Sequence, residues 1–340
     1  MVLRNALGTA MAMLRLHLLA RTTPLSVILS ITNRCNFNCS YCHVGARPAK
    51  EMTTEQILQL VDEMAAAGTQ RIGIQGGEPL LRKDIGEVID HCKRRGLFVT
   101  MGTNGSLLPK KIEEVRNLDA LVLSFDGPNA HDRYRQEGSY DQVIEAIKLA
   151  RRSGIRVWTT TVLTNYSIGD IDLILETAEQ HDFSTYFTPL CQVKETTGDT
   201  SALFASKDDY VATIDRLMDE KRKGRPVVNS LSYLRFMRDW PDFTHTMYLK
   251  DAPVEARRVP CYAGRFFCHI NCNGDVYPCI QLRDEGNPKN ALEVGFREAF
   301  DALLPLPCSA CSTFSFMELN LMFSLHLEAI LNTLRLAAHR

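Results

Sequence analysis

Short apolar runs alternate with longer amphipathic stretches between residue 27 and about residue 190. The runs are rich in β-branched residues, which is typical of buried strands. Strands that alternate with helices in this way favour a parallel sheet built from βαβ units. The pattern therefore predicts six strands, at Val27–Ile31, Arg71–Gln75, Leu97–Met101, Leu121–Phe125, Val157–Val162 and Thr185–Thr188.

The stretches between these strands carry signals for the starts and ends of helices. Thr53 or Thr54 can cap a helix that runs to Ala67, and Asp84 fits the start of the next one. Ser139 precedes a third helix over residues 140–153. Glycines fit the ends of the three helices, at Gly68, Gly96 and Gly154. Six such units form most of an α/β barrel, in which ligands gather at the carboxyl ends of the strands.

The pattern changes on both sides of this region, so we expect five parts in the chain. Met11, Leu14 and Leu18 recur at helical spacing near the N-terminus, and short aromatic strands with many cysteines follow Pro260. The expected parts are an N-terminal amphipathic helix (1–24), a partial (β/α)6 TIM-like barrel (25–190), a helical bridge (191–257), a small cysteine-rich domain (258–312) and a C-terminal helix (313–340).

Composition favours a globular protein that acts in the cytoplasm. Hydrophobic residues make up 45% of the 340 residues and charged residues 23%, close to the averages for such proteins. Lys plus Arg (39) nearly balance Asp plus Glu (40), so no nucleic-acid partner is expected. Arg4 and Arg15 interrupt the apolar N-terminus, and Glu318 and Glu328 interrupt the apolar C-terminal stretch, so we predict neither a signal peptide nor a transmembrane helix.

The eleven cysteines are grouped, which favours metal ligands over a disulfide framework. Cys35, Cys39 and Cys42 follow the first predicted strand with the spacing C-x3-C-x2-C. Three thiolates can hold one corner each of an iron-sulfur cube and leave one iron open for another ligand. A zinc site would need a fourth ligand, and the candidate His43 is too close to Cys42 to chelate comfortably with it.

The spacing of these cysteines, with the aromatic Tyr41 before the last of them, resembles the signature of the radical S-adenosylmethionine superfamily. The resemblance implies an enzyme in which the three cysteines hold a 4Fe-4S cluster and the open iron binds the methionine end of S-adenosylmethionine. Reductive cleavage of that cofactor then gives a 5′-deoxyadenosyl radical, which abstracts a hydrogen from the substrate. The resemblance places Tyr41 near the adenine.

Further motifs at predicted strand ends match cofactor-binding segments of the same superfamily. Gly76 and Gly77 can bring the backbone close to the cofactor, and the resemblance implies that Glu78 binds the ammonium group of the methionine end. Asn104, Ser124 and Asp126 are expected to line the cofactor pocket, with Ser124 on the ribose. The resemblance makes Arg135 a partner for the methionine carboxylate, while a solvated run of charges is the alternative.

The second group of cysteines resembles the SPASM/twitch class of C-terminal extensions. Residues 265–279 are predicted to form a hairpin with its turn at Asn273–Asp275. The resemblance implies an auxiliary 4Fe-4S cluster on Cys261, Cys279, Cys308 and Cys311. Two alternatives stay open: Cys268 or Cys272 replaces one of these ligands, or the pair Cys308 and Cys311 belongs to a zinc site. Cys92 is expected in the core, and Cys191 beside the pocket.

The leading functional hypothesis is oxidation, or formation of a carbon–carbon or carbon–sulfur bond, on a small molecule or peptide. The auxiliary cluster would transfer electrons, and a reductant such as flavodoxin or ferredoxin would supply the first one. Because Val27 already begins the first strand, no peptide-recognition domain is expected before the barrel. The apolar ends leave a second hypothesis, a lipid or other hydrophobic substrate at a membrane surface. A third is a non-catalytic iron-sulfur or zinc scaffold.

Overall fold

A computed structural model describes residues 11–12, 16, 18, 21–42, 44–191, 200–283 and 285–338. Most of the predicted N-terminal helix lies outside these residues, as does His43. Six parallel strands follow one another in the sheet in chain order, in agreement with the predicted partial barrel. They are β1 (Ser26–Ser30), β2 (Arg71–Gln75), β3 (Phe98–Thr103), β4 (Ala120–Ser124), β5 (Val157–Leu163) and β6 (Ser184–Pro189).

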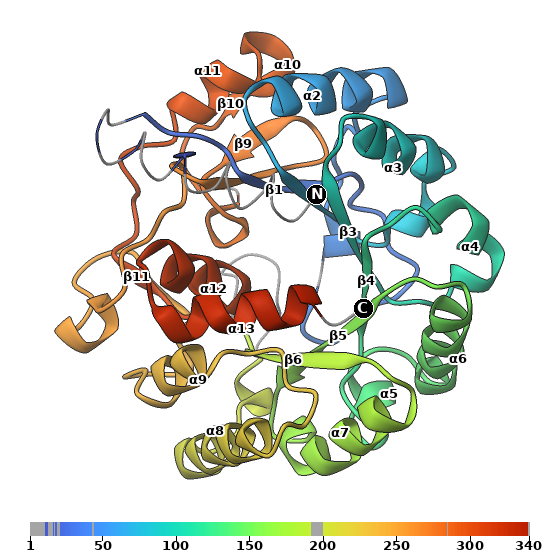
Figure 1. Cartoon of the computed structure of the whole chain (residues 1–340), viewed down its shortest axis with the longest axis vertical. Helices are drawn as coiled ribbons and strands as arrows, with labels where there is room; N and C mark the ends of the chain where they lie inside the picture. Colours follow the sequence, from blue (N-terminus) through green and yellow to red (C-terminus); the bar gives the residue numbers. More distant parts are fainter. Residues whose placement is uncertain are drawn as a thin grey trace.

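Helices cover the outer side of this curved sheet (Figure 1). Thr53 and Gln56 form the capping box that starts the first of them, as the sequence predicts. Asp84 stands before the next one without capping it, because its carboxylate accepts hydrogen bonds from Thr54 and Arg82. These outer helices are α2 (Thr54–Ala66), α3 (Ile85–Arg94), α4 (Leu108–Val115), α5 (His131–Tyr134), α6 (Ser139–Arg152) and α7 (Ile171–Gln180).

The predicted cysteine-rich hairpin is joined to the barrel sheet. Strand β8 (Phe267–Ile270) runs parallel to β1, with Ser26 opposite Phe267. It pairs in the antiparallel sense with β9 (Asp275–Tyr277), and Gly274 takes a φ of 94° in the turn between them. With β10 (Lys289–Asn290), the sheet has nine strands in the order β10-β9-β8-β1-β2-β3-β4-β5-β6. The C-terminal extension therefore shares its sheet with the barrel.

The remaining described elements lie beyond β6 and around the hairpin. Helices α12 and α13 lie within the ring that the strands and outer helices form (Figure 1). A second, two-stranded sheet pairs β7 with β11. These elements are α8 (Lys207–Arg222), α9 (Leu231–Arg238), β7 (Met247–Tyr248), α10 (Ala291–Val294), α11 (Phe296–Asp301), β11 (Ala310–Cys311), α12 (Phe314–Phe323) and α13 (Leu327–Ala338).

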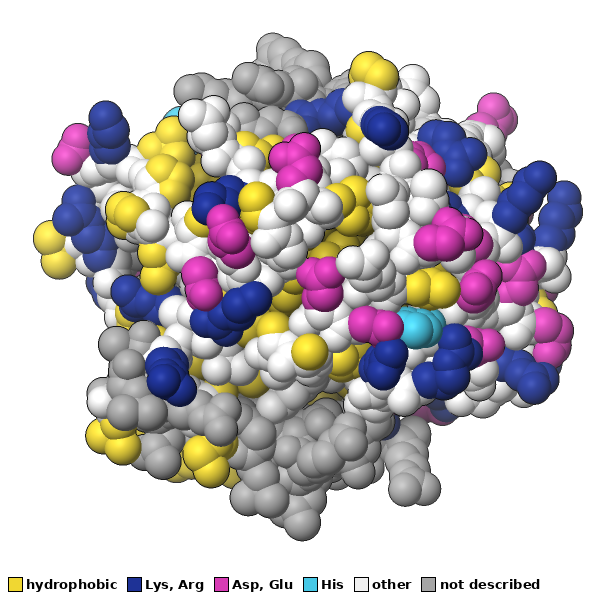
Figure 2. Space-filling model, turned by 90° about the horizontal axis from the view of Figure 1, so that it is seen from above, with side chains coloured by type: hydrophobic (Ala, Val, Ile, Leu, Met, Phe, Trp, Pro, Cys, Tyr) yellow, Lys and Arg dark blue, Asp and Glu magenta, His cyan; other side chains and the backbone are white. Residues whose placement is uncertain are grey.

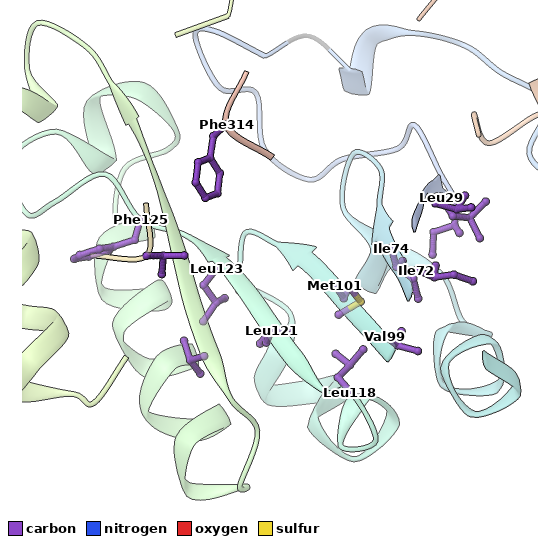
Figure 3. Packing of buried hydrophobic residues seen from close by; sticks show 14 of the residues in the cluster. Leu29, Ile72, Ile74, Val99, Met101, Leu118, Leu121, Leu123, Phe125 and Phe314 are labelled. Carbon is purple, nitrogen blue, oxygen red and sulfur yellow. The ribbon is translucent and has the colours of Figure 1, made fainter. Parts of the chain in front are cut away.

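The main hydrophobic core fills the space between the strands and the outer helices. Leu29, Ile74, Met101 and Leu123 come from four neighbouring strands, and all four are fully buried in it (Figure 3). On the inner side of the sheet, the ring of Phe314 at the start of α12 stacks on Tyr186 of β6 at 4.4 Å. Helix α12 is thereby held inside the barrel, which leaves the strand ends to position polar groups.

Charged side chains of both signs are mixed on the face that carries α2, α10 and α11 (Figure 2). This agrees with the near balance of charge in the chain. Among the described helices, no single one is long and apolar enough to cross a membrane. Helix α12 and residues Leu327–Leu336 of α13 pass that test only as a pair, bent by 116°.

Candidate active site

The three cysteines of the first group lie on the loop that follows β1. Cys39 is buried, Cys35 is half-buried and Cys42 is exposed. A turn closes the loop, because the amide of Cys42 donates to the carbonyl of Cys39 over 3.0 Å. Burial raises the pKa of Cys35 and raises that of Cys39 to about 11, and the charge of Cys42 adds to both shifts. The loop therefore brings the three predicted ligands together, in the part of the barrel where parallel sheets bind ligands.

The loop after β2 packs directly on this cysteine loop through its two glycines. A Cβ atom on Gly77 would lie 2.3 Å from the carbonyl oxygen of Arg34, and one on Gly76 would lie 2.4 Å from that of Thr32. The two loops are also joined by hydrogen bonds. The amide of Gly77 donates to the carbonyl of Thr32, and the amide of Glu78 donates to the carbonyl of Arg34, over 2.8 Å each. Glycine is required here because backbone meets backbone.

Glu78 is fully buried, and its carboxylate is turned into the protein. One oxygen accepts hydrogen bonds from the Thr103 hydroxyl (2.7 Å) and the amide of Leu80 (3.0 Å). The other accepts from the amide of Asn104 over 2.8 Å. Burial raises the pKa of Glu78 despite these bonds. The carboxylate thus ties the end of β2 to the end of β3, while its contact with a methionine ammonium stays a prediction.

Three of the predicted cofactor-binding residues form one buried group. The Asp126 carboxylate pairs with Arg135 at 2.8 Å and accepts a hydrogen bond from the Tyr41 hydroxyl at 3.2 Å. The guanidinium of Arg135 also lies 5.6 Å from the centre of the Tyr41 ring. Burial alone would lower the pKa of Arg135, but the neighbouring Asp126 raises it, so this cation is permanent. The alternative of a solvated run of charges is therefore wrong for Arg135.

The other two predicted residues at strand ends differ in their surroundings. The Asn104 side chain donates to Asn36 on the cysteine loop over 3.0 Å and accepts from Ser106. Ser124 is half-buried at the end of β4, opposite Thr160 of β5. The Asn104 side chain thus holds two loops together, whereas the contact of Ser124 with the cofactor stays a prediction.

Sequence reasoning missed Arg82, which is central to the position of the cysteine loop. Its buried guanidinium donates to the carbonyls of Ile31 and Met52 over 3.1 Å each and pairs with Asp84. It thereby fixes the end of β1 just before the cysteine loop begins. No spacing in the sequence marks this arginine, because its partners are carbonyl groups of distant segments.

The four cysteines of the second group also lie close together. Burial raises the pKa of all four thiols, to about 11 for Cys308 and about 12 for Cys311. The charges of Cys311, Cys261 and Cys308 add to the burial that raises the pKa of Cys279, and Cys261, Cys279 and Cys308 belong to one hydrophobic cluster, so these thiols are neighbours. Such thiols lose their protons readily only to a metal. The donor set therefore fits a cluster or metal bound by four thiolates.

The extra cysteines lie elsewhere. Cys268 is fully buried in β8 opposite Val27, and both pack in the main core. Cys272 is buried, and burial raises its pKa; the charges that act on it are those of Arg283 and Glu51 and not those of the four thiols. Cys92 is a core thiol, as predicted, and Cys191 follows β6 with its thiol 3.6 Å from the carbonyl of Pro189.

One buried hydrogen bond links the two cysteine groups. The Arg283 guanidinium, four residues after Cys279, donates to the Asn33 side chain over 2.7 Å. Asn33 in turn lies two residues before Cys35. The segments that carry the two cysteine groups are therefore in direct contact.

All eleven cysteines are free thiols, so the disulfide alternative is not supported. Within the described residues, no three His, Cys, Asp or Glu side chains converge as the ligands of a single metal ion do. This weighs against a preformed zinc site, which needs four ligands at about 2.0–2.3 Å from one ion.

A cleft of about 520 Å³ opens beside the first cysteine loop. It is lined by Asn33, Arg34, residues 45–49 and Glu51. Residues 33–50 include Arg34, Arg47 and Lys50 but no Asp or Glu. Glu51 on the wall of the cleft pairs with Arg34 at 3.1 Å, so Arg47 and Lys50 are the other cations of this stretch.

Comparison with known proteins gives consistent matches. Residues 29–178 match the model of the radical SAM superfamily. An AdoMet-dependent heme synthase from Methanosarcina barkeri is 28% identical over 291 residues, which is 82% of each chain. Mycofactocin maturase MftC from Mycobacterium tuberculosis is 27% identical over 281 residues, 80% of this chain and 68% of that protein. The fold resembles that of Streptococcus suis SuiB bound to S-adenosylmethionine, with a TM-score of 0.66 and 18% identity over 82% of this chain and 66% of SuiB.

Proposed function

Because the chain is a radical S-adenosylmethionine enzyme with a cysteine-rich C-terminal extension, we propose that Cys35, Cys39 and Cys42 hold its 4Fe-4S cluster. Cys261, Cys279, Cys308 and Cys311 then hold an auxiliary 4Fe-4S cluster. When bound, the first cluster and S-adenosylmethionine together supply a 5′-deoxyadenosyl radical, which removes a hydrogen atom from the substrate. The three thiols and the loops that fix them carry this assignment.

The buried group of Tyr41, Asp126 and Arg135 prepares the cofactor site. Arg135 is a fixed cation whose guanidinium suits the methionine carboxylate of S-adenosylmethionine. Asp126 holds Arg135 at 2.8 Å and the Tyr41 hydroxyl at 3.2 Å, so the ring beside Cys42 keeps one orientation for the adenine. Glu78 holds the ends of β2 and β3 together through Thr103 and Asn104, and its contact with the methionine ammonium, like the contacts of Asn104 and Ser124 with the cofactor, is part of the proposal.

The second cysteine group supports an oxidative reaction or a bond-forming one. A substrate that has lost a hydrogen atom must lose a further electron to become an oxidised product. Four thiolate ligands complete the coordination of a cluster, so this cluster is suited to accept an electron and not to bind substrate. The single observation that supports this proposal is the grouping of one buried thiol, Cys279, with three half-buried ones, Cys261, Cys308 and Cys311, in a region tied to the first loop by Arg283 and Asn33.

The substrate is proposed only as a class, a small molecule or a peptide. The relatives are named for different products, heme in one case and mycofactocin in the other, and do not select one of these. The reductant is proposed to be an acidic electron carrier such as flavodoxin or ferredoxin. Arg47 and Lys50 near the cysteine loop would face it, while Arg34 is paired with Glu51.

Anaerobic reconstitution followed by iron and sulfide analysis tests the two-cluster proposal. The wild-type chain should bind about eight irons, four for each cluster. Cys279→Ala should retain about four, while the core variant Cys268→Ala, a matched control for loss of a buried thiol, should keep about eight. Full iron in Cys279→Ala, or zinc in place of iron in the wild type, would overturn the auxiliary cluster.

A further inference from the structure

An apolar surface lies on the C-terminal helical hairpin, outside both cysteine groups. Leu325, in the corner between α12 and α13, is 67% exposed, and Leu327, Leu331 and Leu334 on α13 are 69%, 44% and 51% exposed. The three residues of α13 follow one another at intervals of four and three, so they share one face of the helix. These four side chains are called the leucine face below.

Polar contacts fix the orientation of α13, so the leucine face is not a consequence of loose packing. The Glu328 carboxylate accepts hydrogen bonds from the amides of Leu231 (3.0 Å) and Ser232 (2.8 Å) at the start of α9. On the next turn, the Asn332 side chain donates to the carbonyl of Val228 over 2.9 Å. Because Ala329 is fully buried on the same side, α13 cannot turn its leucines inward without breaking these bonds.

Leu325 adds a conformational argument. It follows α12 with a φ of 60°, in the left-handed region where glycine or asparagine is usual. A leucine there is strained, and its exposed side chain gains nothing from the fold in return. An exposed apolar side chain held in this conformation is available for contact with something outside the chain.

The leucine face is extended by residues near the N-terminus. Ala12 and Leu16 pack with Phe316 and Phe323 of α12 in one cluster. On the other side of this helical segment, Met11 is 49% exposed and Leu18 is 70% exposed. The N-terminal segment is thus packed against α12, the helix that precedes α13, and both segments carry exposed apolar side chains.

Cations accompany these apolar side chains. Arg21 is exposed near the N-terminal segment, and Arg335 is exposed on α13. Arg265 is also exposed, and its carbonyl accepts a hydrogen bond from the amide of Thr23. None of these three arginines forms an ion pair with the part of the chain that the structure describes. The first fifty residues hold six Lys or Arg and no Asp or Glu, and only arginines follow Glu328 among charged residues. Exposed leucines flanked by unpaired arginines match the surface of a bilayer that contains anionic lipid.

We propose that this surface, the leucine face with Met11 and Leu18, rests on a membrane whose lipids are partly anionic. The hairpin lies on such a membrane and does not enter it deeply, because the opposite sides of α12 and α13 are buried in the protein. The charge pattern favours a lipid surface over a second copy of this chain. In a symmetric contact between two copies, the arginines of one copy would lie opposite the arginines of the other and repel them. The proposal concerns where the enzyme works and does not depend on its substrate.

Flotation of the reconstituted holoenzyme with vesicles tests this proposal. Vesicles of phosphatidylcholine mixed with phosphatidylglycerol should carry the protein upward, and added salt or pure phosphatidylcholine should weaken the association at least tenfold. The triple variant Leu327→Glu, Leu331→Glu and Leu334→Glu should lose at least tenfold in partition. Leu292→Glu, at an exposed leucine on α10, should bind as the wild type does.

Leu325→Gly separates membrane contact from folding. It removes an apolar contact and a strained conformation together, so it should weaken vesicle binding while thermal stability stays equal or rises. The proposal is overturned if the wild type fails to float with anionic vesicles, or if the triple variant floats equally well. It is also overturned if the wild type is a dimer that the triple variant converts to monomers without any vesicle binding.

Discussion

The contact between Gly77 and the cysteine loop offers a sharp perturbation, because a single methyl group should disturb the first cluster site. In Gly77→Ala the new Cβ would lie 2.3 Å from the carbonyl oxygen of Arg34 and 2.5 Å from that of Asn33. Neither oxygen can rotate away, since both belong to backbone. The two loops must therefore separate and lose the hydrogen bonds that join them.

The expected cost is about 3 kcal/mol of unfolding free energy, the upper end of the range for overpacking, because rigid backbone is displaced. Gly169→Ala is the matched control. Gly169 is exposed, and a Cβ there has no neighbour within 4 Å, so the change should stay below about 1 kcal/mol. Urea denaturation of the metal-free proteins measures both effects.

The same variant should lose iron selectively after reconstitution. Gly77→Ala should keep about four irons on the second cysteine group and lose about four from the first. An unfolding free energy within about 1 kcal/mol of the wild type, together with a full complement of iron, would refute the view that the two loops are locked by contact at this glycine.

Two further predictions concern buried charge. Asp126→Asn leaves the Arg135 cation buried without its partner and should lower the free energy of unfolding, measured by urea denaturation, by about 3–5 kcal/mol. The control Asp215→Asn removes an exposed ion pair and should lower it by less than about 1 kcal/mol. Equal losses in the two variants would contradict the importance of the buried pair. Burial lowers the pKa of His269 to about 4, as it does for His131. Since the unfolded value is near 6.5, each histidine stabilises the fold above that pH and loses its contribution as the pH falls toward 4. Between pH 7 and pH 5, the free energy of unfolding of His269→Gln should therefore fall by about 2 kcal/mol less than that of the wild type. An unchanged pH profile would count against a buried, neutral His269.

The strands were predictable from sequence because their cores are apolar runs bounded by turn residues. Residues 71–75 form β2 as predicted, and the other strands shift by one or two residues at their ends. Helices α4 and α7 were not assigned individually, and neither begins with a side-chain cap that a sequence pattern could reveal. Local chemistry therefore limits what sequence can say about element boundaries.

Grouped cysteines were informative because metal ligands must be close in space, and short spacings ensure that closeness. The separation of Cys268 from the second group depended on strand pairing between residues 26–29 and 267–270, which no local pattern encodes. The inward turn of the Glu78 carboxylate was also beyond prediction. The sequence shows a carboxylate after a strand, but only the packing of Thr103 and Asn104 decides where it points.

The central claim is that Cys35, Cys39 and Cys42 support cleavage of S-adenosylmethionine. Formation of 5′-deoxyadenosine by the anaerobically reconstituted enzyme, with S-adenosylmethionine and a strong reductant, tests it most directly. The wild type and the core-thiol control Cys92→Ala should form 5′-deoxyadenosine, and Cys35→Ala should form none above the level without enzyme. Product from Cys35→Ala at the wild-type rate, or none from a wild-type chain loaded with iron, would contradict the account.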